Sequence, residues 1–338
     1  MTRPKQTPSR GKTRVSPPKK RGAKAKLLLS AAFLLLMALL IAVMALSARV
    51  VHVRHTDVYL QDLPAGFDGI TILYVSDIDL LSESTFRATR RLFQRMQALK
   101  PDVLLLGGDY TSETLLSILN RQGDVSAENS NREIALRNEF FRALETFSAP
   151  MGKYAVRAQA DPSVGVLEAA MAASQITLLQ DEAIPLYSGA ERIYLVGLAP
   201  FAEDSAALSG MSGQFSAGDC VVVAAHSAGS FSAIQIAEAS DGGTWADLVL
   251  CGHSHGGQIR FGDRTLVQLT NRERQYLAGW YVENGVKLLV SQGLGCEGVA
   301  LRLGSAPEAH LLTLRKGEPP LSAENVSRET FSFWTQQP

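Results

Sequence analysis

Acidic, amide and imidazole side chains, all able to bind metal ions, follow five apolar runs of the sequence. The runs are residues 70–75, 103–106, 153–157, 220–225 and 248–251, and the side chains after them are Asp77, Asp79, Asp109, Gln159, His226, His253 and His255. Carboxylate, amide and imidazole groups together suit Mn, Fe, Zn or Mg ions. Two such ions a few ångströms apart can clamp a phosphate group and activate water. The pattern therefore indicates a metal site with hydrolytic chemistry.

Each of these residues taken singly is a weak signal. An acid after a buried strand, such as Asp77 or Asp109, is often a helix cap or a turn residue. A histidine after an apolar strand, such as His226, is more often a hydrogen-bonded core residue. The run Gly252-His253-Ser254-His255 is more specific, because its glycines permit a tight turn that projects two imidazoles from one loop. The hypothesis depends on the whole ordered set.

The elements that must position these residues follow from the apolar patterning. Strand-like runs alternate with helical spacing over residues 84–99 and 138–147 in the first half, and the second half is strand-rich. This alternation predicts an α/β domain with its site in the loops after the strands. Residues 112–135 are polar and are predicted to form a surface insertion. Residues 316–338 are predicted to be a polar C-terminal tail.

The ordered motifs resemble those of the calcineurin-like metallophosphoesterase superfamily. They are Asp-x-Asp, Gly-Gly-Asp, Ala-Gln-Ala-Asp, a single His and Gly-His-Ser-His. The membrane-anchored bacterial branch is the closer match, through Gly-His-Ser-His-Gly-Gly-Gln at 252–258, Gly-Leu-Gly at 293–295 and Pro-Glu at 307–308. The similarity covers about residues 50–315. It implies a four-layer αββα sandwich with a dinuclear metal centre.

The resemblance also implies a role for each matching residue. Asp77 and His255 would bind the first metal ion, Asp109 would bridge the two ions, and His226 and His253 would bind the second. Asp79 stands where the family has a histidine and Gln159 stands where it has an asparagine, and both keep an oxygen that can bind a metal. The carboxylate of Asp79 makes the ligands of the first site harder, in the sense of hard and soft donors, which favours Mn²⁺-like ions over Zn²⁺.

Two further departures concern catalysis. Ala160 occupies the position of the family's catalytic histidine, so Asp161, which would orient that histidine, has nothing to orient. Ser112 replaces a second acid of the motif and weakens support of the metal ligands. General acid–base help is worth about 10²–10⁴ in rate, so reactions with poor leaving groups should suffer most.

Two hypotheses of function remain open at this point. The first is a membrane-anchored, metal-dependent phosphoesterase acting on a phosphorylated small molecule or lipid. In the family branch such substrates include phosphodiesters and lipid-linked pyrophosphates. The second is a pseudo-enzyme that keeps the fold as a module binding a metal, a phospholipid or a protein, which the substitution at Ala160 motivates.

The charges are distributed unevenly along the chain. The 338 residues contain 33 Lys and Arg against 33 Asp and Glu, a net charge of zero that argues against a nucleic-acid partner. Residues 1–26 nevertheless carry ten basic residues and no acid. This basic arm is predicted to be disordered. The oligomeric state does not follow from the sequence.

An uncharged run of 22 residues, 27–48, follows the basic arm. At about 1.5 Å per residue it is long enough for a bilayer core of roughly 30 Å. The arm predicts a cytoplasmic N-terminus, a single membrane span and an extracytoplasmic domain over residues 49–315. A cleaved signal peptide is the alternative, although its apolar region is usually only about 7–15 residues long.

Overall fold

The chain divides into two compact units, residues 1–43 and 44–338. The structure, a computed structural model, describes residues 21–112, 125–200, 205–262, 264–266, 269–319 and 326–332. Helix α1 (Arg21–Ser47) supplies the described part of the first unit. Its stretch Lys24–Ser47 is long and apolar enough to cross a membrane, a property that a signal sequence shares.

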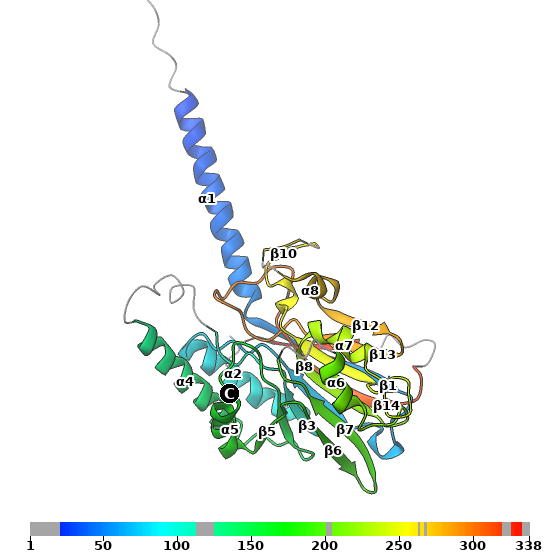
Figure 1. The fold of residues 1–338 in the computed structure, drawn as a ribbon. Helices are drawn as coiled ribbons and strands as arrows, with labels where there is room; N and C mark the ends of the chain where they lie inside the picture. Colours follow the sequence, from blue (N-terminus) through cyan, green and yellow to red (C-terminus); the bar gives the residue numbers. More distant parts are fainter. Residues whose placement is uncertain are drawn as a thin grey trace, which may run out of the picture. The chain divides into compact units, whose positions relative to one another are not determined.

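Two β-sheets form the framework of the second unit (Figure 1). Across the described residues, the larger sheet has the order β15-β1-β14-β2-β3-β4-β5, with β1 (Val50–Leu60), β2 (Thr71–Val75), β3 (Val103–Leu106), β4 (Lys153–Ala155), β5 (Ile176–Leu178), β14 (Glu308–Lys316) and β15 (Val326–Ser332). The smaller sheet has the order β12-β13-β9-β8-β7-β6, with β6 (Glu182–Ser188), β7 (Glu191–Gly197), β8 (Val221–Ser227), β9 (Leu248–Gly252), β12 (Gly279–Glu283) and β13 (Val286–Val290). A separate short ribbon pairs β10 (Arg260–Phe261) with β11 (Arg264–Thr265).

Apolar side chains from both sheets fill the space between them. Ile72 and Leu105 of the larger sheet belong to the same buried cluster as Val222, Leu250 and Leu289 of the smaller sheet. The sheets therefore pack face to face. Strands that are covered on both faces bury both sets of their side chains, which explains the nearly continuous apolar runs of β2, β3, β8 and β9.

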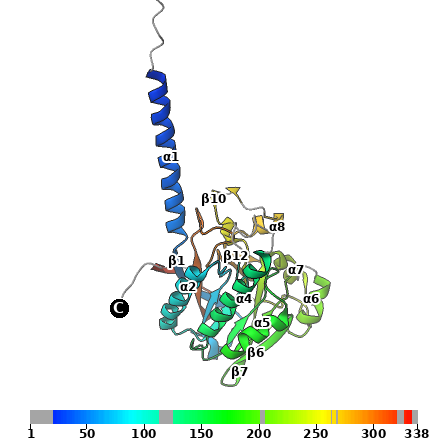
Figure 2. The ribbon, with the colours of Figure 1, turned by 90° about the vertical axis from the view of Figure 1, so that its left-hand side faces the viewer.

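Helices cover the outer face of each sheet (Figure 1 and Figure 2). The larger sheet carries α2 (Glu83–Met96), α4 (Val125–Ala143) and α5 (Val164–Met171), and the smaller carries α6 (Ser205–Ser212) and α7 (Phe231–Ile236). Phe93 and Phe141 share a buried cluster with Leu104 of β3, and Phe231 shares another with Val249 of β9. The layers run helix, sheet, sheet, helix, so the αββα sandwich expected from the resemblance is confirmed.

Local sequence signals account for helix α2. The backbone N–H of Thr85 donates to Oγ of Ser82 over 3.3 Å, and the backbone N–H of Ser82 donates to Oγ1 of Thr85 over 2.9 Å. This reciprocal capping box satisfies N–H groups that have no partner within the helix. The residues buried along α2 recur at three- and four-residue spacing and are Phe86, Thr89, Leu92, Phe93 and Met96.

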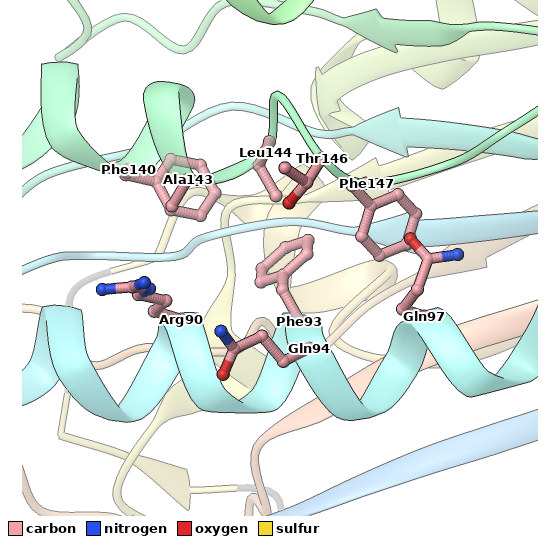
Figure 3. A pocket seen from close by; sticks show the side chains of 9 residues that line it. All are labelled: Arg90, Phe93, Gln94, Gln97, Phe140, Ala143, Leu144, Thr146 and Phe147. Atoms are coloured by element: carbon pink, nitrogen blue, oxygen red, sulfur yellow. The ribbon is translucent and has the colours of Figure 1, made fainter.

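A small pocket of about 130 Å³ lies between α2 and the C-terminal part of α4 (Figure 3). The rings of Phe93, Phe140 and Phe147 line it together with polar side chains such as Arg90 and Gln94. None of the predicted metal ligands lines this pocket, so it is separate from the candidate site.

The central strands of both sheets run parallel. In the larger sheet β2, β3, β4 and β5 are parallel neighbours, and in the smaller sheet β7, β8, β9 and β13 are. The carboxyl ends of parallel strands meet at one edge of their sheet. The loops after β2 and β3 therefore lie together, as do the end of β8 and the loop after β9.

Two predictions about the polar segments need correction. The predicted tail contributes β15, which pairs antiparallel with β1, an otherwise exposed edge that attracts a pairing strand. The predicted insertion over residues 112–135 becomes helix α4 from Val125 onward, while residues 113–124 lie outside the described residues. Among the side chains of α4 that the structure describes, Leu136 and Phe140 in its second half are buried, while the sequence from Val125 to Glu133 carries too few apolar residues to predict a helix.

Candidate metal centre

Six of the seven predicted ligands come together from the ends of four strands. Asp77 and Asp79 follow β2, Asp109 follows β3, His226 lies in β8, and His253 and His255 follow β9. Two groups have ligand atoms that all lie within 4.8 Å of one another: Asp109 with His226 and His253, and Asp77 with Asp109 and His255. Asp109 belongs to both groups. The arrangement fits two metal ions that share one carboxylate.

The first group joins the two sheets. Nε2 of His226 lies 3.4 Å from Oδ2 of Asp109 and 3.2 Å from Nδ1 of His253. Nδ1 of His226 lies 2.8 Å from the carbonyl oxygen of Gly107, which can only accept a hydrogen bond. The carbonyl thus holds the proton of His226 on Nδ1 and leaves Nε2 free to face Asp109.

The carboxylate of Asp79 lies next to the second group, beside His255. Nε2 of His255 lies 3.9 Å from Oδ1 of Asp77 and 3.6 Å from Oδ2 of Asp79. The backbone N–H of His253 donates to Oδ1 of Asp77 over 2.8 Å and so fixes the orientation of this carboxylate. Asp79 therefore stands within reach of an ion held by Asp77 and His255.

The backbone at five of the predicted ligands is left-handed. The φ values are 50° at Asp77, 46° at Asp79, 56° at Asp109, 72° at His253 and 50° at His255. Residues other than glycine adopt this region at a cost of about 1–3 kcal/mol each, and such residues cluster at functional sites. Aspartate and histidine tolerate the region better than most residues do. The concentration of this strain in the ligand loops favours a binding role over a purely structural one.

Glycines allow neighbouring loops to approach the carboxylates closely. A Cβ atom on Gly252 would lie 2.3 Å from Oδ2 of Asp77, and one on Gly295 would lie 2.6 Å from Cβ of Asp79. Any side chain at these positions would displace a ligand. The Gly-His-Ser-His and Gly-Leu-Gly motifs therefore serve the packing around the two carboxylates.

Buried carboxylate oxygens without hydrogen-bond partners are the clearest sign that the site suits a cation. Asp77 is fully buried and Asp79 is 3% exposed, yet Oδ2 of each has no hydrogen-bond partner. Burial and the charges of Asp109 and Asp77 raise the pKa of Asp79 well above its usual value. Unpaired buried charges are costly unless they bind a metal. The donor set therefore fits divalent cations.

The histidines of the two groups differ in their protonation. Burial lowers the pKa of His226, but the hydrogen bond and charge of Asp109 outweigh it and raise the pKa to about 9. The pKa of Asp109 is lowered in turn, because its interaction with His226 outweighs the effect of burial. Burial lowers the pKa of His255 to about 4, in part with help from Arg302. The carboxylate of Asp109 thus favours positive charge next to it.

Asp161 has a role that the sequence did not reveal. Its carboxylate accepts the backbone N–H groups of Asp109 over 2.9 Å, Tyr110 over 3.1 Å and Ala158 over 2.8 Å. The expectation that Asp161 has nothing to orient is therefore wrong, since it ties the Asp109 loop to the loop after β4. Asp109 keeps its position through its backbone as well as its side chain.

Two residues that contact ligand histidines were missed. The fully buried guanidinium of Arg302 donates to carbonyl oxygens of Gln292 over 2.7 Å and His255 over 3.3 Å. Glu273, in helix α8 (Asn271–Gln275), lies 2.8 Å from Nε2 of His253 through Oε1. Both come from irregular segments far along the chain, where no periodicity or motif marks them.

Three positions that depart from the family pattern, other than Asp79, are not fully buried. The side chains of Gln159 and Ala160 are exposed, and Ser112 is partly buried. That Gln159 binds a metal ion stays a prediction. The chain contains six histidines, and the three outside the ligand groups are His52 and His55 of β1 and His310 of β14. None of these three belongs to the loop of Ala160.

A cavity of about 470 Å³ lies beside Asp79. Its lining includes apolar residues such as Leu294, hydroxyl groups such as that of Thr85, and the basic residues Arg49 and Arg91. Mixed apolar and basic lining suits an anionic organic molecule better than a purely apolar one.

Comparison with known proteins gives limited similarity. No family model matches the chain. The Uncharacterized protein YpbG of Bacillus subtilis (strain 168) is 40% identical over 68 residues, which are 20% of this chain and 23% of that protein. The chain thus matches less than a quarter of the length of this relative.

Solved structures similar to this chain include two enzymes. A dimetal phosphatase from Danio rerio is 9% identical with a TM-score of 0.39, over 67% of this chain and 88% of that one. The phosphopantetheinyl hydrolase PptH from Mycobacterium tuberculosis is 10% identical with a TM-score of 0.36, over 69% of this chain and 92% of that one. A shared activity does not follow from similarity at this level.

Proposed function

We propose that this protein is a membrane-anchored, metal-dependent phosphoesterase of the calcineurin-like metallophosphoesterase type. The observation that carries the proposal is the position of Asp109, which belongs to both groups of ligand atoms. One carboxylate shared by two ligand groups is what a two-metal hydrolytic site requires. The extracytoplasmic location of the domain is part of the proposal and rests on the basic arm before the apolar helix.

Each ligand has a distinct task in this proposal. Asp77, Asp79 and His255 would hold one ion, His226 and His253 would hold the other, and Asp109 would contribute to both. When bound, such ions supply positive charge to the phosphoryl oxygens and lower the pKa of the attacking water. Asp161 keeps Asp109 in place through the backbone N–H. His226 must lose its Nε2 proton before Nε2 can serve as a ligand.

The ligand set favours Mn²⁺ or Mg²⁺. The second group has the carboxylates of Asp77 and Asp109 and a single imidazole, of His255, and the carboxylate of Asp79 lies 3.6 Å from that imidazole. Carboxylate-rich sites select hard cations, whereas imidazole- and thiolate-rich sites suit Zn²⁺. Mn²⁺ accepts both carboxylate and imidazole ligands, so we expect it to support the reaction best.

The substrate is proposed to be a phosphodiester or lipid-linked pyrophosphate with a good leaving group. Ala160 and its exposed neighbour Gln159 supply no imidazole to protonate a departing alkoxide. The cavity beside Asp79, with Arg49 and Arg91 in its lining, offers room for an anionic substrate next to the ligands.

A non-catalytic role is the second candidate, and Ala160 favours it. The chain has no histidine to spare for general acid catalysis, because three lie in the ligand groups and three in β1 and β14. In that case the site would bind metal ions and a phosphorylated ligand without turning it over.

The deciding experiment measures turnover with the full-length chain in detergent. An activated aryl phosphodiester is assayed with and without Mn²⁺, alongside Asp109→Ala and the matched control Asp62→Ala on an exposed turn. We expect Mn²⁺-dependent hydrolysis that falls by a factor of about 10³ or more in Asp109→Ala only. Bound Mn²⁺ without turnover would instead support the non-catalytic role, and no bound metal would overturn both.

A further inference from the structure

Glu273 lies behind one of the ligand histidines, on its outer side. Oε1 of Glu273 is 2.8 Å from Nε2 of His253, while Nδ1 of His253 faces Nε2 of His226 at 3.2 Å. The structure places Glu273 in α8, away from the four strands that deliver the ligands. We infer that Glu273 is a positioning residue, which makes Nδ1 of His253 the ligand atom and sets the affinity of one metal ion. This inference rests on the proposed metal-dependent function.

The hydrogen-bonding chemistry of the pair determines which nitrogen is free. An ionised carboxylate only accepts hydrogen bonds, so the neutral imidazole of His253 carries its proton on Nε2, towards Glu273. Its lone pair is then on Nδ1, which points into the group with Asp109 and His226. Such carboxylate–histidine pairs fix the ring orientation and increase the basicity of the ligand nitrogen.

Glu273 is itself held firmly. Its Oε2 accepts the backbone N–H of Thr270 over 2.6 Å, and its own backbone N–H donates to Oγ1 of Thr270 over 3.3 Å. This reciprocal cap uses one carboxylate oxygen and leaves the other for His253. The side chain of Glu273 is 11% exposed, so little water competes for the contact.

The other ligand histidine of the same loop has a different partner. Nδ1 of His255 lies 3.4 Å from Nη2 of Arg302, which can only donate. Glu273 therefore acts on the Asp109, His226 and His253 group alone. Loss of the Glu273 charge should therefore weaken the binding of one of the two ions and leave the binding of the other unchanged.

Metal titration of the full-length protein tests the inference. Mn²⁺ is titrated against a competing chelator in the native chain and in Glu273→Gln, and the visible spectrum of Co²⁺ reports the geometry of each ion. We expect one dissociation constant to rise about 10–100-fold, the other to stay the same, and the Co²⁺ bands of a single site to change.

The control Tyr276→Phe removes the hydrogen bond from the hydroxyl of Tyr276, just after α8, to Glu283, and keeps both Thr270 and the carboxylate of Glu273. We expect it to lower the melting temperature without changing either Mn²⁺ affinity. Equal weakening in Tyr276→Phe and Glu273→Gln would overturn the inference, because Glu273 would then act only by stabilising this part of the fold. Unchanged affinities in Glu273→Gln, with two ions bound to the native chain, would also overturn it and leave the proposed function intact. A native chain without bound metal would overturn both.

Discussion

Asp109 is the residue on which the candidate centre depends. Its carboxylate is shared by two ligand groups, its φ is 56°, and its backbone N–H is held by Asp161. Its pKa is lowered because its interaction with His226 outweighs burial, so it is charged and ready to bind cations. Asp109 combines a strained backbone, a partly buried charge and a position shared by two ligand groups, and metal binding explains all three.

A substitution at a second single residue, Ala160→His, tests whether Ala160 occupies the position of the missing catalytic imidazole. Because Ala160 is exposed, Ala160→His can be accommodated without displacing the core. We expect hydrolysis of an alkyl phosphodiester to rise by about 10²-fold, as general acid help would give. The aryl phosphodiester, whose leaving group needs no proton, should change little.

Ala160→Gln, which adds bulk without a proton of suitable pKa, is the matched control for steady-state rates. Equal gains for the alkyl and aryl substrates, or a gain in Ala160→Gln, would contradict the assignment. In the present chain Asp161 is already engaged by three backbone N–H groups, so the new imidazole must act without its help.

At the scale of the elements, the strands that deliver the ligands were predictable from the sequence. The residues that contact the ligand histidines from other parts of the chain were not. The apolar runs that form β2, β3, β8 and β9 are continuous because both sheet faces are covered, and the ligands follow at their ends. Glu273 and Arg302 escaped prediction because long loops bring them to His253 and His255. Only the folded chain shows such contacts, since neither residue belongs to a periodic pattern.

The start of β8 provides a prediction of pH dependence. Oδ2 of Asp247 accepts the backbone N–H of Val221 over 2.8 Å, and burial raises the pKa of Asp247 to about 6 from a usual value of 3.8. A carboxyl group with a raised pKa binds its proton more tightly in the folded state. Its contribution to stability is full below about pH 4 and is lost as the pH rises through about 6, by up to about 3 kcal/mol.

Asp247→Asn keeps the acceptor and removes the charge, so its free energy of unfolding should not show this fall. Urea denaturation at several pH values between about 4 and 7 measures the difference. Asp102→Asn is the matched control, because Asp102 accepts the backbone N–H of Thr71 at the equivalent start of β2. A variant Asp247→Asn that loses stability in parallel with the native chain would contradict the prediction.

At the scale of the whole molecule, the zero net charge is the sum of a basic N-terminal segment and an acidic remainder. Ten basic residues precede the uncharged run 27–48, and the rest of the chain carries 23 bases against 33 acids. Part of that acidic excess, in Asp77, Asp79 and Asp109, lies in the candidate centre, where bound cations would balance it. The sequence predicted this division, but it did not predict that the C-terminal segment returns to pair with β1.

The apolar helix predicts how the chain behaves in cells. We expect the full-length protein in a bacterial host to stay with the membrane pellet after an alkaline carbonate wash. Removal of residues 27–47 should release it. A tag at the N-terminus should survive and be protected from protease outside the cell. A protein that is recovered in soluble form without its N-terminal tag would contradict the anchor and support a cleaved signal peptide.

The most direct test of the metal centre is anomalous X-ray scattering from crystals of the protein grown with Mn²⁺. Two anomalous peaks about 3.5–4 Å apart are expected, as in other two-metal sites. Both should lie within bonding distance of Asp109, one beside Asp77 and His255 and the other beside His226 and His253. A single peak, or peaks that leave Asp109 unbound, would contradict the dinuclear centre.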